Sequence, residues 1–127
     1  MFISTWDKVA YHGSKTKKVN TFQVVLISDG KLTFLMYNYL DLQWPSLKLN
    51  VMEGPSALAG LNNDNGSTYY QLPTSLSTNI TSLAATSNVK VNGRWAFNVD
   101  TSVIQFTDTF IAPILQLSFT LRVQFYA

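Results

Sequence analysis

Apolar and polar positions alternate along much of this chain, and the alternation predicts strands. The clearest case is FQVVLISDGKLTFLMYNY at 22–39, where two runs of β-branched and aromatic residues flank a short polar break. An Asp-Gly pair between such runs favours a hairpin, because glycine supplies the positive φ of a type I′ turn. We therefore predict a two-residue turn at Asp29 and Gly30, with Ser28 facing Lys31 across the ladder.

Both faces of this predicted hairpin are apolar. One face would carry Val25, Ile27, Leu32, Phe34 and Met36, and the other Phe22, Val24, Leu26, Leu35 and Tyr37. A hairpin with one side in water would have a polar face. We therefore expect both faces to be covered, as in the interior of a layered structure.

Shorter patterns predict the remaining elements. Residues 4–11 and a lysine-rich connection precede the hairpin, which indicates a three-strand meander. Alternation also predicts a half-buried strand at 47–51, a short strand at 69–72 and a strand at 94–100. Apolar residues at 80–84 fit one helical turn.

The C-terminal segment 114–125 has a strict period of two. Its apolar positions are Leu115, Leu117, Phe119, Leu121, Val123 and Phe125. Burying six such side chains is worth on the order of 10 kcal/mol, which is too much to leave in water. We expect an amphipathic strand that either pairs with the sheet or aggregates.

Composition narrows the classes of protein. The 127 residues fit one domain, and the 13% of charged residues suits a β-rich extracellular module better than long helices. A net charge of +2 indicates no nucleic-acid partner, and we interpret Lys15, Lys17 and Lys18 as a solvated loop, with heparin or acidic glycan contact as the alternative. The absence of cysteine leaves the redox compartment open. No apolar run is long enough to span a membrane.

Three stretches, in this order, carry a family resemblance. They are NTFQVVL at 20–26, GLNNDNG at 60–66 with the following YYQLPTS, and SNVKVNGRWAFNVD at 87–100. The set resembles the NIDO domain, a nidogen-like extracellular module. Asn92 departs from the family pattern, which has proline there, and so does the Pro45 to Lys48 segment.

The resemblance implies a fold and a function. It implies an all-β, antiparallel, sandwich-like module with at most one short helical segment. Residues 1–100 would be the domain, truncated at its N-terminus, and 101–127 a divergent tail. The function implied is non-enzymatic, in extracellular matrix or cell-matrix adhesion, with loops presented to matrix proteins or glycans beside neighbouring modules of a larger protein. The module would be secreted, with the signal peptide encoded upstream, because residues 1–6 carry none.

Catalytic, cofactor and metal sites are not expected. The seven carboxylates are spread over turns and strand ends without paired spacing, and His12 lies in a lysine-rich loop. Asn62, Asp64 and Asn65 resemble the start of a calcium loop, but the glutamate that would close it is missing. We interpret these residues as turn formers.

Two alternatives to matrix assembly stay open. A lectin-like module would bind carbohydrate through Trp44, Asn62, Asp64, Tyr69 and Tyr70, because exposed aromatic rings stack on sugars. An intracellular β domain would lack an export signal in the full reading frame.

The chain contains two sequons, about the number that its asparagine, serine and threonine content predicts by chance, so they are no argument for secretion. Asn65 and Asn79 each begin the Asn-X-Ser/Thr pattern of N-glycosylation. Both are candidate glycan sites if the chain is exported.

Overall fold

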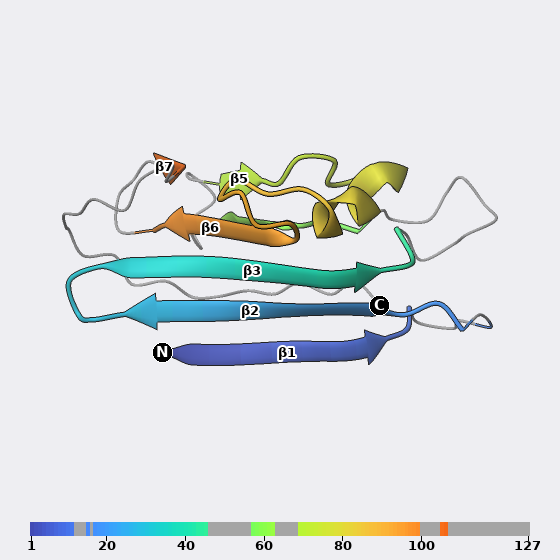
Figure 1. Ribbon diagram of the computed structural model, residues 1–127, viewed down its shortest axis with the longest axis horizontal. Helices are drawn as coiled ribbons and strands as arrows, with labels where there is room; N and C mark the ends of the chain where they lie inside the picture. The colour runs from blue at the N-terminus through green and yellow to red at the C-terminus, as the bar shows by residue number, and fades with distance from the viewer. Residues whose placement is uncertain (12–14, 16, 46–56, 63–68, 100–104, 107–127) are drawn as a thin grey trace.

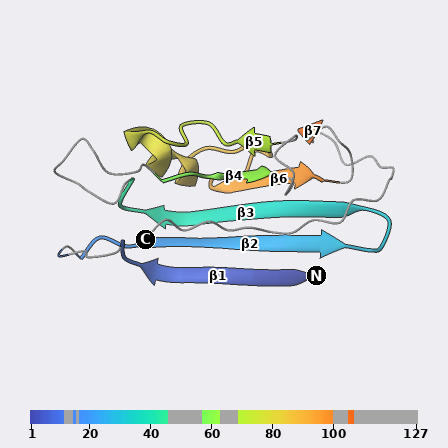
Figure 2. The ribbon, with the colours of Figure 1, turned by 180° about the vertical axis from the view of Figure 1, so that it is seen from behind.

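The structure, a computed structural model, describes residues 1–11, 15, 17–45, 57–62, 69–99 and 105–106. Seven strands and one 3₁₀ helix occur within them (Figures 1 and 2). In chain order they are β1 (Phe2–Val9), β2 (Asn20–Ser28), β3 (Thr33–Leu42), β4 (Gly60–Asn62), β5 (Tyr69–Gln71), η1 (Thr78–Ala84), β6 (Arg94–Asn98) and β7 (Gln105–Phe106).

The strands form one large antiparallel sheet and one small one. The large sheet has the order β1-β2-β3-β6-β7, and β4 pairs with β5 alone. The β4–β5 hairpin and η1 lie beside β3 and β6, at a distance from β1 (Figures 1 and 2). The all-β prediction is confirmed, and so is the single short helical segment near residues 80–84.

The predicted register of the β2–β3 hairpin is wrong by two residues. Ser28 pairs with Thr33 instead of Lys31, so the connection has four residues, 29–32. The side chain of Asp29 is the cause: its Oδ1 accepts hydrogen bonds from the backbone N–H of Lys31 at 2.8 Å and of Leu32 at 2.7 Å. These bonds, from Leu32 first and Lys31 second, lower the pKa of Asp29 below its ordinary value.

A bulge in β3 sets which side chains reach the core. Thr21 pairs with Asp41 and Phe22 with Tyr39, so Leu40 is the extra residue. Its side chain is 78% exposed. Beyond the bulge Asp41 pairs with Thr21 and is exposed, whereas Leu42 pairs with Asn20 and packs against the core.

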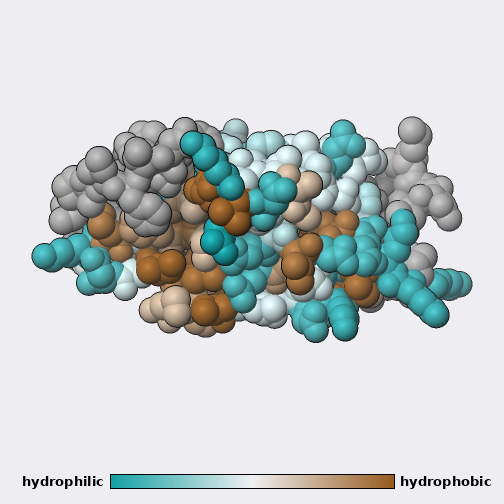
Figure 3. Space-filling model, viewed as in Figure 1, coloured by the Kyte–Doolittle hydropathy of each residue, from teal (hydrophilic) through white to brown (hydrophobic). Residues whose placement is uncertain are grey.

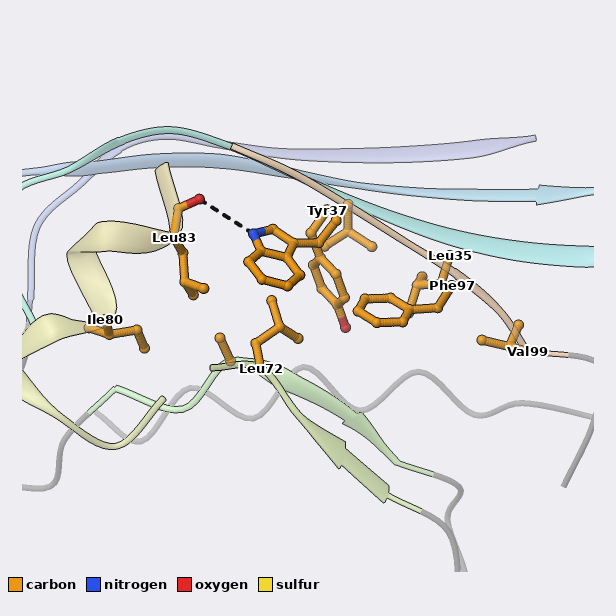
Figure 4. Close-up of a cluster of buried hydrophobic side chains, with 10 residues drawn as sticks. Leu35, Tyr37, Leu72, Ile80, Leu83, Phe97 and Val99 are labelled. Carbon is orange, nitrogen blue, oxygen red and sulfur yellow. Dashed lines mark hydrogen bonds between the residues drawn. The ribbon is translucent and has the colours of Figure 1, made fainter. Parts of the chain in front are cut away.

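The core lies between the inner face of the large sheet and the layer formed by η1 and β4–β5. Its buried members are Val24, Leu35, Tyr37, Ala59, Leu72, Ile80, Leu83, Trp95, Phe97 and Val99. Figure 4 shows Ile80 and Leu83 of η1 and Leu72 on the opposite side of the cluster from Tyr37 and Phe97. The indole N–H of Trp95 donates to the carbonyl oxygen of Leu83, which ties η1 to β6 (Figure 4).

Aromatic rings run across this inner face from one edge strand to the small sheet. Successive ring centroids are 5.1 to 6.3 Å apart. In order the rings are Trp6, Phe22, Tyr39, Tyr37, Phe97 and Tyr70. Stacked and edge-on aromatic pairs add to the free energy gained by burial, so this row links four strands of the large sheet to β5.

One further sequence prediction is confirmed, and two cannot be compared with the structure. The lysine-rich connection between β1 and β2 is confirmed as the first loop of the meander, with Lys15, Lys17 and Lys18 exposed. The predicted strands at 47–51 and 114–125 lie outside the described residues.

Candidate interaction surface

A row of polar side chains crosses the outer face of the large sheet, opposite the core. Thr5, Gln23, Asn38 and Arg94 occupy one register position on β1, β2, β3 and β6. We call these four residues the outer polar row. Because strand side chains alternate between faces, this row points away from the buried cluster on the inner face.

The outer polar row is a continuous hydrogen-bond chain. The Gln23 amide donates to the Thr5 hydroxyl at 2.9 Å, and the Asn38 amide donates to the Gln23 carbonyl oxygen at 3.1 Å. Arg94 completes the chain by donating from Nε to Asn38 Oδ1 at 3.0 Å. Each side chain thus holds its neighbour in one orientation.

Arg94 is the charged end of the row and is exposed. Among the described residues no carboxylate forms an ion pair with it. Its guanidinium group has five N–H donors, and the Nε–H is the one used by Asn38. The remaining donors form a planar fork suited to carboxylates and to main-chain carbonyl oxygens.

An apolar row lies directly beside the polar one. Ile3, Val25, Met36 and Ala96 occupy the next outward register position on the same four strands. Val25 is buried, whereas Ile3 is 48% exposed and Ile27, one position further along, is 38% exposed. Figure 3 shows a hydrophobic group over the start of β1 and the end of β2. On the inner face Val24, Leu35 and Tyr37 are buried and Phe22 and Leu26 half-buried, so the prediction that both faces are covered holds better there than on the outer face.

The segment before β6 fixes the position of Arg94. The Ser87 hydroxyl donates to the Arg94 carbonyl oxygen at 2.7 Å. The Asn88 side chain pairs with Ala96 as a strand would, donating to its carbonyl oxygen at 2.8 Å and accepting from its N–H at 2.9 Å. These two side chains occupy the edge of β6 where β7 does not reach, since β7 pairs with Phe97 and Asn98.

Gly93 makes the close approach of this segment to β3 possible. It has a φ of +77°, and a Cβ atom there would lie 2.2 Å from the Tyr39 carbonyl oxygen. The Gly93 carbonyl oxygen accepts a 2.7 Å hydrogen bond from the Tyr39 N–H. Only glycine fits this backbone without moving β3 or β6.

Trp44, which the sequence predicted to contact a ligand, makes contacts that hold the fold together. Its indole N–H donates to the Val9 carbonyl oxygen at 2.9 Å, and its ring meets Tyr11 edge-on at 5.9 Å. Asn20, which is 5% exposed, accepts from the backbone N–H of Trp44 and donates to its carbonyl oxygen. Trp44 is half-buried by these contacts, at the end of β3.

The other predicted contacts lie on the β4–β5 hairpin. Asn62 pairs with Tyr69, and both are exposed, Tyr69 at 73%. Tyr70 turns inward against Phe97 at 5.2 Å, and its burial raises the pKa of its hydroxyl. Asp64 lies outside the described residues. The structure thus joins Asn62 with Tyr69, and separates this pair from Trp44.

Metal-ligating side chains form no cluster in the described part of the chain. No three histidine, cysteine, aspartate or glutamate side chains gather there to hold a metal ion. His12 and Asn65 lie outside the described residues. Within those residues, no helix has the length and apolar character needed to cross a bilayer.

Comparison with known proteins identifies the module. The family model described as "Nidogen-like domain" matches residues 1–101, which include β1 to β6. The chain belongs to the nidogen-like domain family. The resemblance expected from the sequence motifs is therefore confirmed.

The chain is similar in sequence to alpha-tectorin and to nidogen. The nidogen-like chain is 42% identical over 107 residues to alpha-tectorin of Mus musculus and of Homo sapiens, covering 79% of this chain and 5% of each relative. It is 34% identical over 107 residues to nidogen of Drosophila melanogaster, covering 78% of this chain and 8% of that protein. The chain thus spans less than a tenth of the length of these relatives. No solved structure matches it significantly.

The family motifs contain two of the four residues of the outer polar row. Gln23 lies in NTFQVVL, and Arg94 lies in the final motif beside Ser87, Asn88 and Gly93. Sequence reasoning did not find the row. The available signal was that Gln23 and Asn38 are outward polar positions inside otherwise apolar strands.

Proposed function

We propose that this nidogen-like chain is a non-enzymatic module of an extracellular matrix protein that binds other matrix proteins. Its membership of the nidogen-like family over residues 1–101 carries the proposal. The relatives named alpha-tectorin and nidogen support an extracellular setting. Loops at the strand ends were the predicted contact sites, and those at 46–56 and 63–68 lie outside the described residues.

The outer polar row adds a described surface to those loops. Its hydrogen bonds fix four side chains before any partner arrives, which lowers the entropy cost of binding. The exposed guanidinium of Arg94 and the neighbouring apolar row combine a polar anchor with apolar area. Buried arginines at the centre of protein interfaces are frequent contributors to affinity.

A binding experiment tests this proposal. The chain, fused to a signal peptide and secreted from cultured animal cells, is applied to immobilised extracellular matrix. We expect saturable binding that is lost when the matrix is treated with protease and kept after treatment with glycosidases. Arg94→Gln should weaken binding about tenfold, the loss of one interface anchor. Lys17→Gln, which removes an equal charge from the β1–β2 loop, is the matched control.

Two results would contradict the proposal: failure of the chain to be exported, and export without binding to any matrix. Equal binding by Arg94→Gln and Lys17→Gln would contradict the role given to the outer polar row. The first result would favour the intracellular β domain. The last would reject the outer polar row and leave the loops as the contact sites.

Carbohydrate binding is a second candidate, favoured by one observation. Tyr69 is 73% exposed and pairs with the exposed Asn62, so an aromatic ring and an amide lie side by side. This combination suits stacking and hydrogen bonding to a sugar. Loss of matrix binding after glycosidase treatment, and in Tyr69→Ala but not in Arg94→Gln, would support this function instead.

A further inference from the structure

We infer that Asn79 carries an N-linked glycan, an inference that rests on the extracellular setting proposed above. Asn79, Ile80 and Thr81 satisfy the chemical requirement of the modification, a carboxamide with a hydroxyl residue two positions later and no proline between. The structure adds three observations to this pattern.

The first observation is the direction of the Asn79 and Ile80 side chains. Ile80 is 5% exposed and belongs to the core cluster, whereas Asn79 is exposed. The buried Ile80 fixes the orientation of η1, and this orientation points its neighbour to solvent. A glycan on Asn79 therefore projects outward without displacing core side chains.

The second observation is that the Asn79 carboxamide has no structural task. The N-terminus of η1 is capped by Ser77, whose hydroxyl accepts from the Asn79 backbone N–H at 3.2 Å. Within the described residues the Asn79 side chain makes no hydrogen bond. By contrast, the side chains of Asn20, Asn38 and Asn88 all hold the fold by hydrogen bonds. None of those three begins a sequon.

The third observation is the position of η1 relative to the outer polar row. Ile80 and Leu83 attach η1 to the inner face of the sheet, whereas the row lies on the outer face. A glycan at Asn79 leaves Arg94 free to contact a partner. It covers the layer that already encloses the core.

The test measures glycosylation and export separately. The 127-residue chain with a signal peptide is expressed in animal cells, and peptide mass spectrometry with and without peptide N-glycosidase is applied to both the cell extract and the medium. We expect the glycan on the Asn79 peptide, absent from Asn79→Gln and Thr81→Ala and retained in Thr81→Ser. Thr78→Ala, an exposed neighbour outside the sequon, should keep it, and Asn65→Gln separates the second sequon.

Each outcome decides the inference. An unmodified Asn79 peptide in both the extract and the medium overturns it, whether or not the chain is exported. A modified peptide in the extract with no protein in the medium supports the glycan and contradicts the proposed function. If the glycan is compatible with the fold as described, its enzymatic removal should leave the melting temperature and the binding of the secreted chain to matrix unchanged. A large change in either would contradict the outward placement.

Discussion

The two faces of the large sheet are built from the same strands but hold together by different physics. The inner face carries a row of aromatic rings packed against buried aliphatic side chains. The outer face carries a chain of hydrogen bonds between exposed or half-exposed polar side chains. The inner row gains free energy by leaving water, whereas the outer row exchanges hydrogen bonds with water and gains little.

This difference separates stability from recognition. Removing an inner side chain should strongly lower the free energy of unfolding, and removing an outer one should change the surface with little loss of stability. Substitutions on the outer face of this chain should therefore cost the fold little. The predictions below test this separation, from the largest effect on stability to the smallest.

Phe97→Ala should have the largest effect. Phe97 is fully buried between Tyr37 and Tyr70, and truncating a buried phenylalanine costs about 3–5 kcal/mol of unfolding free energy. Urea unfolding followed by tryptophan fluorescence measures the loss. Phe97→Leu, which keeps most of the volume, should lose less than about 1.5 kcal/mol. A loss below about 1 kcal/mol for Phe97→Ala would show that this face is not packed as described.

Gly93→Ala should destabilise more than Gly30→Ala. Both glycines have positive φ, so alanine is strained at each by about 1–2 kcal/mol. At Gly93 the new Cβ also meets the Tyr39 carbonyl oxygen at 2.2 Å, whereas at Gly30 no atom lies within 4 Å. Chemical denaturation gives the loss of unfolding free energy for each variant. Gly93→Ala should show the cost of backbone strain and a steric clash, and Gly30→Ala the cost of strain alone. Equal losses would exclude the close approach of β3 and the segment before β6.

Alkaline pH should weaken the inner face. Burial raises the pKa of Tyr37 and Tyr39 above the ordinary value of 10.0, and for Tyr39 the nearby Tyr37 adds to the rise. Their stabilisation is complete below pH 10 and is lost above it, because the unfolded chain releases these protons first. The expected slope is about 1.4 kcal/mol per pH unit for each tyrosine.

Tyr37→Phe should reduce that slope relative to the parent chain. The variant also loses the 2.6 Å hydrogen bond from the Tyr37 hydroxyl to the Gly60 carbonyl oxygen, at about 1 kcal/mol at neutral pH. Urea midpoints at pH 8 and pH 11 measure both effects. An unchanged slope would mean that Tyr37 reaches solvent.

Gln23→Ala and Asn38→Ala should have the smallest effects. Each removes exposed or partly buried hydrogen bonds of the outer polar row and should cost less than about 1 kcal/mol. Their double-mutant cycle should show a coupling of about 0.5 kcal/mol, because the two side chains bond to each other. If either variant lost as much unfolding free energy as Phe97→Ala, the two faces would not differ in their contribution to stability.

Residue alternation alone assigns the side chains of each strand to the two faces of the sheet. Strand side chains alternate with a period of two, so Val24, Leu35 and Tyr37 were assigned together before the structure placed them in the core. The register error in the hairpin did not disturb this assignment. A shift of two residues changes the partner of every side chain but returns each one to the same side.

Which residues pair across strands depends on the tertiary structure. Hydrogen bonds to the Asp29 carboxylate stabilise a four-residue loop in place of the predicted turn. The bulge at Leu40 then shifts the pairing by one residue. The outer polar row depends on the loop, because Gln23 and Asn38 pair on the turn side of the bulge. It also needs Arg94, which is 56 residues from Asn38 in the chain. Local patterns cannot encode such a contact, because it exists only when separate strands are aligned by hydrogen bonds that form on folding.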